Sequence, residues 1–135
     1  MESNPVQSVL SLDKLFFDRV SFSMNETLLQ DKSPKYELSF ERKVSELQKD
    51  QKYRVSLLCK INEDASQLSF EARVVGVFSV LSESCEIRDL LIKKNTLTVL
   101  FPYLRSMISL ITSQGNIPPI VLPILNIAEM FEDNN

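Results

Sequence analysis

One segment near the end of the chain limits the possible folds more than any other. Residues 117–125 are almost wholly apolar, yet Pro118, Pro119 and Pro123 interrupt them. Proline lacks a backbone N–H, so this segment can form neither a helix nor an inner strand. An apolar segment without regular structure must be buried against the rest of the fold, or it must form a wall of a site for something apolar.

An amphipathic helix is predicted directly before this segment, over residues 99–113. Apolar residues recur there at helical spacing: Leu100, Leu104, Met107, Ile108 and Ile111. Pro102 is expected in or near the first turn, and Gly115 is expected to follow the last turn. The apolar arc of this helix is wide, which indicates that copies of the chain associate.

The first two thirds of the chain alternate between apolar and polar residues, as strands do. Strands are predicted over residues 9–24, 36–44, 53–61 and 68–81, and polar turns join the last three into an antiparallel meander. In the first strand, strict alternation predicts that Phe16, Val20 and Phe22 share one face, with Phe17 on the other. Gly76 indicates a bulge or a close approach in the last strand.

A shorter helix is predicted between the last strand and the main helix. Ser82 or Ser84 can cap its start, Ile87, Leu90 and Leu91 form its apolar stripe, and Asn95 is expected to end it. Another short helix is predicted over residues 127–132. The order of four strands and then helices predicts an α+β fold, a four-stranded antiparallel sheet with helices on one face, in a single domain over residues 1–135.

Composition argues against several classes of function. The net charge is −3 and histidine is absent, so we expect neither nucleic-acid binding nor a histidine-based catalytic or metal site. The sequence contains no motif for a metal-binding cluster or a phosphate-binding loop, so we expect neither a cofactor nor an enzymatic activity. Cys59 and Cys85 are predicted to be buried free thiols. We expect a cytoplasmic protein without membrane insertion, since neither a signal peptide nor a long apolar span is apparent.

The sequences L-F-P-Y-L-R-S-M-I-S at residues 100–109 and S-Q-G-N-I-P-P-I-V-L-P-I-L-N-I at residues 113–127 resemble the C-terminal half of the SecB family of protein-export chaperones. The positions that match the family's pattern are Leu100, Phe101, Pro102, Tyr103, Arg105, Gly115, Pro118, Leu122, Pro123 and Asn126. This resemblance implies a SecB-like holdase that assembles as a dimer of dimers. It also implies that unfolded polypeptides bind in an apolar groove between the main helix, the loop after it and neighbouring strands.

Candidate residues for the walls of this groove are large and apolar: Phe16, Phe17, Phe22, Phe78, Tyr103, Met107, Ile117, Ile120, Val121, Leu122 and Leu125. Family members also deliver clients to the SecA motor through acidic residues on the exposed sheet face and through a C-terminal tail. Here Glu71 is the one candidate motor contact, because Arg19 and Ser23 stand at two of the acidic positions. The tail is expected to be missing, since the sequence ends at Asn135.

Three alternatives remain open at this level. The client could be a dedicated protein outside the export pathway, such as an antitoxin, as for some members of the family. The same apolar residues could instead enclose a lipid or another small apolar ligand between sheet and helix. An enzyme would need Glu71 or Asp18 as a general acid, and the sequence shows no catalytic partner for either.

Overall fold

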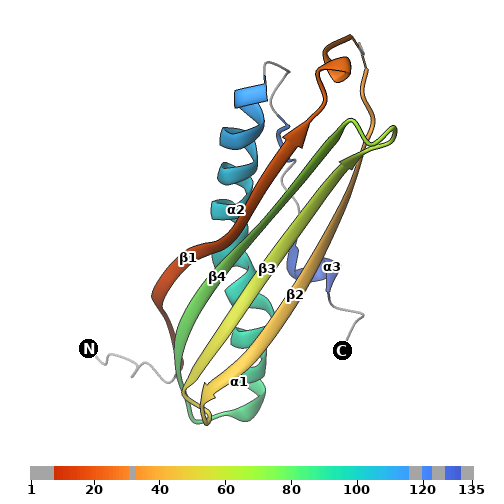
Figure 1. Ribbon diagram of the computed structural model, residues 1–135. Helices are drawn as coiled ribbons and strands as arrows, with labels where there is room; N and C mark the ends of the chain where they lie inside the picture. Colours follow the sequence, from red (N-terminus) through yellow and green to blue (C-terminus); the bar gives the residue numbers. More distant parts are fainter. Residues whose placement is uncertain (1–7, 31–32, 116–119, 123–126, 132–135) are drawn as a thin grey trace, which may run out of the picture.

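The computed structural model describes residues 8–30, 33–115, 120–122 and 127–131, and it confirms the predicted α+β architecture. The strands are β1 (Ser8–Met24), β2 (Tyr36–Gln48), β3 (Lys52–Glu63) and β4 (Leu68–Ser82). The helical elements are η1 (Glu26–Gln30), α1 (Cys85–Leu90), η2 (Leu91–Asn95), α2 (Thr96–Thr112), η3 (Ser113–Gly115) and α3 (Ile127–Met130). The strands form one antiparallel sheet in the order β1-β4-β3-β2, and α1, α2 and α3 lie on one face of it (Figure 1).

Two irregularities in β1 change which residues face the helices. The register of β1 against β4 shifts at Asp13 and again at Asp18. An extra residue reverses the alternation of side chains, so Phe17 lies opposite Val74 on the helix-covered face, whereas Phe16 lies opposite Val75 on the outer face. The prediction from strict alternation, with Phe16 inside and Phe17 outside, is therefore wrong for these two residues.

The helical region is more continuous than predicted. Ser84 caps α1, because its Oγ accepts a hydrogen bond from the backbone N–H of Ile87. No stop occurs at Asn95: the backbone passes through the π-helical turn η2 and on into α2 with helical dihedral angles. Pro102 consequently lies inside α2 and not in a first turn. Its missing N–H costs one hydrogen bond on the exposed side of the helix.

The predicted apolar stripe of the short helix lies mostly outside the core. Ile87 and Leu90 of α1 are exposed, and only Leu91, in η2, packs against the core. Of the two cysteines, Cys59 is buried and Cys85 is exposed, so the prediction that both are free is confirmed and the prediction that both are buried is wrong for Cys85. Burial raises the pKa of the Cys59 thiol to about 12.

The core lies between α2 and the two central strands. Its fully buried large side chains include Leu57 and Ile61 of β3, Phe70 and Phe78 of β4, and Leu100, Leu104 and Ile108 of α2. One helix is about 10 Å wide, whereas four strands spaced about 4.8 Å apart form a wider surface. As a result, inner-facing residues of the edge strands stay open: Val20 of β1 is 42% exposed and Val44 of β2 is 39% exposed.

Gly76 lies where β4 packs tightly against Leu100 of α2, and this confirms the predicted close approach. A Cβ atom at this position would lie 2.5 Å from Cε2 of Phe78 and 2.9 Å from Cδ2 of Leu100. Both neighbours are fully buried, so neither can move aside without disturbing the core.

We predict that Gly76→Ala lowers the free energy of unfolding by about 1–3 kcal/mol, because the added methyl group overpacks the core. Chemical denaturation of the variant and of Ser69→Ala, on the exposed outer face of the same strand, measures the effect. Ser69→Ala should change stability little. A Gly76→Ala protein as stable as the wild type would show that the contact between β4 and α2 is looser than described.

The bulge at Asp18 holds an ionic cluster on the outer face of the sheet. The carboxylate accepts hydrogen bonds from Arg73 Nε at 2.7 Å, from Arg73 Nη2 at 3.0 Å and from Arg54 Nη2 at 3.2 Å. The hydrogen bonds from Arg73, more than its charge or that of Arg54, hold the pKa of Asp18 below its ordinary value of 3.8. Because the pKa of Asp18 is lower in the folded state than in the unfolded state, ionised Asp18 stabilises the fold at any pH above its unfolded-state pKa. This contribution is lost as the pH falls through the lowered pKa of the folded state.

We predict that Asp18→Asn lowers the free energy of unfolding by about 1 kcal/mol at neutral pH, because the partly exposed arginines lose their shared counter-charge. Urea denaturation at neutral pH and in steps down to about pH 2.5 measures the difference between variant and wild type. The difference should shrink as Asp18 of the wild type becomes protonated. A difference that stays constant across this range would contradict the role given to the charge.

Candidate functional site

Helix α2 divides the inner face of the sheet into two uncovered borders. Helical periodicity places Tyr103, Met107 and Leu110 on one flank of α2 and Ser109 on the other. The flank with Ser109 faces β2, because Phe101 on that side meets Phe40 of β2 with ring centroids 6.1 Å apart. We call the border between α2 and β2 the β2 margin and the opposite border, between α2 and β1, the β1 margin.

At the β2 margin, Ile120 is fixed by hydrogen bonds to α2. The backbone N–H of Ile120 donates to Thr112 Oγ1 at 2.9 Å, and Ser109 Oγ donates to the Ile120 carbonyl at 3.4 Å. Leu122 is buried, whereas Val121 between these two anchored residues is 70% exposed. The local geometry therefore holds an apolar side chain in solvent beside the helix.

Arg42 of β2 fixes the part of the β2 margin that lies next to η2 and Phe131. Its Nη1 donates to the carbonyl of Lys93 in η2 at 3.0 Å, and its guanidinium carbon lies 5.2 Å from the centre of the Phe131 ring. This residue was missed at the level of sequence. The sequence feature that could have identified Arg42 is its position in β2: it alternates in step with Phe40 and Val44 and therefore faces the helices. A charged side chain that faces inward needs polar or aromatic contacts, and Lys93 of η2 and Phe131 provide them.

The β1 margin is apolar and contains no covering segment among the described residues. It is defined by Leu12 and Val20, which are exposed on the inner face of β1, and by Tyr103, Met107 and Leu110 of α2. Phe17 and Phe22 lie beneath it, half-buried against the core. In Figure 1, α2 emerges beyond β1, whereas α3 lies on the opposite side of α2, toward β2.

The structure does not gather the candidate groove residues into one surface. Phe17, Phe22, Tyr103 and Met107 belong to the β1 margin, and Ile120, Val121 and Leu122 belong to the β2 margin. Phe78 is fully buried in the core, and Phe16 lies on the outer face. Ile117 and Leu125 lie outside the described residues.

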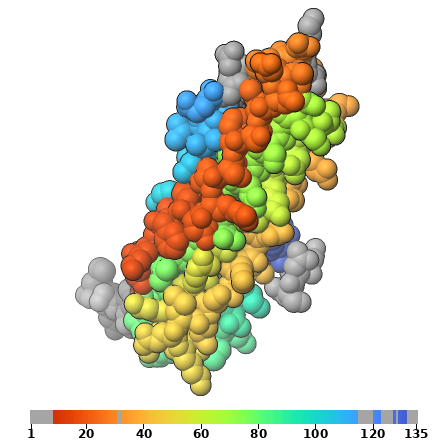
Figure 2. All heavy atoms as spheres, viewed as in Figure 1, coloured from red at the N-terminus to blue at the C-terminus, as the bar shows by residue number. Residues whose placement is uncertain are grey.

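Glu71, the candidate motor contact, lies on the outer face of the sheet, and Figure 2 shows this face with β1 running across it. The carboxylate of Glu71 forms an ion pair with Arg19 Nη1 at 3.2 Å. Ser23 lies on the same face, further along β1. The candidate motor contact is therefore already paired with Arg19 within the fold.

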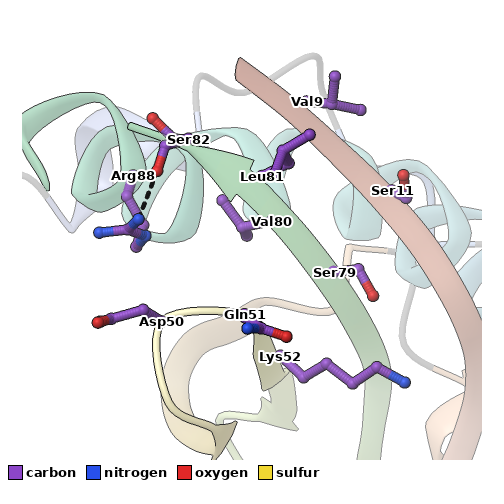
Figure 3. Close-up of a pocket in the computed structure, with 10 residues that line it drawn as sticks. All are labelled: Val9, Ser11, Asp50, Gln51, Lys52, Ser79, Val80, Leu81, Ser82 and Arg88. Atoms are coloured by element: carbon purple, nitrogen blue, oxygen red, sulfur yellow. Dashed lines mark hydrogen bonds between the residues drawn. The ribbon is translucent and has the colours of Figure 1, made fainter. Parts of the chain in front are cut away.

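A hollow of about 580 Å³ lies at the end of the sheet, where β1 and β4 extend past β3 (Figure 3). Arg88 and Asp50 face each other across an open gap, and Val80 and Leu81 of β4 lie to one side of them. Arg88 Nη2 donates to the carbonyl of Ser82, so the guanidinium occupies the edge of β4 that β3 leaves unpaired. This hollow is separate from both margins.

The space between α2 and the sheet is filled by core side chains, so an internal pocket for an apolar small molecule receives no support from the described residues. The same residues contain no cluster of acids and cysteines able to hold a metal ion. None of the helices described is both long enough and apolar enough to cross a membrane.

Comparison with known proteins places this geometry in a family. A protein of Methanocaldococcus jannaschii without an assigned function is 26% identical over 133 residues, 94% of this chain and 85% of that protein. Protein-export protein SecB of Alcanivorax borkumensis is 23% identical over 134 residues, 93% of this chain and 85% of that protein. Among solved structures, the same fold occurs in the SecB-like chaperone Rv1957 of Mycobacterium tuberculosis, which was solved in complex with a ChAD peptide from the HigA1 antitoxin. The two structures match with a TM-score of 0.68 and 16% sequence identity, over 86% of this chain and 90% of that one.

The family model for SecB, the preprotein translocase subunit, matches residues 3–135. The match includes the four strands, the long helix and the proline-containing segment beside it. This chain is therefore a member of the SecB family.

Proposed function

We propose that this protein is a holdase that binds unfolded polypeptides along the β2 margin. The observation that carries the proposal is the exposed side chain of Val121, which Ile120 and Leu122 hold in solvent next to α2. Leu38 and Val44 on the inner face of β2 are exposed as well, so apolar surface lies both on β2 and at Val121 beside α2. Burial of these side chains against a client supplies binding energy without a sequence-specific polar code.

Further observations support a polypeptide as the client. Leu38, Val44 and Val121 are exposed side chains, which suit a chain that lies along the surface better than a small molecule that must be enclosed. Arg42 already holds Lys93 and Phe131 in place at this margin, so a client does not have to order these residues when it binds. Relatives of this chain are named protein-export proteins, and a structural neighbour is a SecB-like chaperone with a bound peptide.

The β1 margin, by contrast, suits contact with further copies of the chain. It is bordered by β1 and α2 with no covering segment among the described residues, and β1 also leaves its outer backbone edge unpaired. Large apolar surfaces of this kind on a small protein indicate permanent association. We propose that this margin is the subunit contact and that the assembly is a dimer of dimers, as the family resemblance implies.

The outer face supports a client outside the export pathway. Arg19 and Ser23 stand where the resemblance expects acids, and Arg19 pairs with Glu71. An acid already paired within the fold offers little to a partner. We therefore favour a dedicated non-export client over delivery to SecA, and a contact of Glu71 with SecA stays a prediction.

We predict that Val121→Asp weakens binding of an unfolded client about tenfold, because a carboxylate replaces an apolar contact worth about 1.5 kcal/mol. Titration of a reduced, carboxymethylated, fluorescently labelled protein measures the dissociation constant. Leu90→Asp is the matched control, since Leu90 of α1 is 49% exposed and belongs to neither margin. Equal loss in both variants, or no binding of unfolded chains by the wild type, would overturn the proposal.

We predict that Leu110→Asp dissociates the assembly, because a charge at the β1 margin cannot be buried between subunits without a partner. Light scattering after size-exclusion chromatography measures the mass: the wild type should exceed the 15.5 kDa of one chain several-fold, and the variant should approach it. Leu47→Asp, at an exposed position in the irregularity of β2 between Glu46 and Gln48, should leave the mass unchanged. A wild-type protein of monomer mass at micromolar concentration would contradict the subunit contact.

A further inference from the structure

The outer face of the sheet has a charge opposite to that of the chain as a whole. Three arginines lie on it, and the acids next to them are already engaged. Arg54 and Arg73 both bind Asp18, Arg19 pairs with Glu71, and Asp13 accepts a hydrogen bond from Ser79. Two of the acids on this face, Asp18 and Glu71, are thus paired with arginines of the fold itself.

Four lysines on the same face have no such partner. The strand registers place Lys14 of β1, Lys43 of β2, and Lys52 and Lys60 of β3 on the outer face. In the part of the chain that the structure describes, none of them forms an ion pair. With the three arginines they outnumber the outer-facing acids, Asp13, Asp18, Glu37, Glu41 and Glu71, by seven to five, although the whole chain carries a net charge of −3.

Apolar side chains are interspersed with these lysines. Lys14 lies opposite Val77, and the neighbouring cross-strand pair is Phe16 with Val75. Phe16 is 41% exposed, and Leu81 is exposed at the end of the same face. A surface that combines unpaired ammonium groups with exposed apolar side chains matches a partner that presents carboxylates and apolar residues together.

We propose that the outer face docks an acidic polypeptide segment that carries apolar side chains among its carboxylates. The unpaired lysines supply the electrostatic attraction, and Phe16 and Leu81 supply apolar contact. A nucleic acid fits this face less well, because Asp18, Glu41 and Glu71 would lie close to its phosphates and the excess of positive charge is small. The site is separate from the β2 margin, and the inference does not depend on the proposed holdase activity.

The probe is a short fluorescein-labelled peptide in which glutamates alternate with leucines, and fluorescence anisotropy measures its binding to the full chain. We expect binding at low salt that weakens strongly at about 0.3 M NaCl. Lys14→Glu combined with Lys60→Glu should weaken binding about tenfold, because two attractive contacts become repulsive. The matched control combines Lys35→Glu with Lys93→Glu, two exposed lysines away from this face, and should change binding less than about twofold.

Further measurements make the outcome of the binding experiment decisive. Thermal unfolding must show that both double variants are folded. Val121→Asp must leave binding of the probe unchanged, which separates this face from the client surface. The proposal is overturned if the wild type does not bind the probe, if both double variants weaken binding equally, or if a lysine–leucine peptide or a single-stranded oligonucleotide binds as tightly as the acidic probe.

Discussion

A single helix is too narrow to cover the sheet on which it packs, and the rest of the molecule follows from this mismatch. Side chains of β3 and β4 beneath α2 are almost completely removed from solvent, whereas Val20 of β1 and Val44 of β2 remain well exposed on the same face. Burying the two margins would gain hydrophobic free energy. Each margin is therefore a place where further polypeptide can bind, either from the same chain, from another copy or from a client.

The two margins differ in how the chain itself deals with them. Toward β2, Ile120 is held against α2 by hydrogen bonds with Ser109 and Thr112, and Arg42 contacts Lys93 and Phe131. Toward β1, the described residues leave the surface open. This asymmetry gives one protein two apolar surfaces with different properties, one suited to permanent contact between copies and one suited to transient contact with unstructured chains.

Periodicity in the sequence was sufficient to predict the four strands, the long helix and their layered arrangement, because alternation and helical spacing directly reflect burial in this fold. Three features escaped it for identifiable reasons. The bulge at Asp18 exchanges the faces of Phe16 and Phe17, and one extra residue leaves no trace in a pattern of apolar residues. The π-helical turn carries the helix through Asn95, where a stop was expected. Finally, candidate groove residues were grouped by their apolar character alone, which cannot tell the two flanks of α2 apart.

The central claim is that the two margins have different occupants, and hydrogen exchange tests it most directly. Amide exchange of the assembled protein should be followed by mass spectrometry with and without a saturating unfolded client. The account predicts that added client slows exchange in β2 and in residues 120–131, while β1 is equally protected in both samples. Protection that appears in β1 on addition of client, with β2 and residues 120–131 unchanged, would contradict the assignment of the two margins.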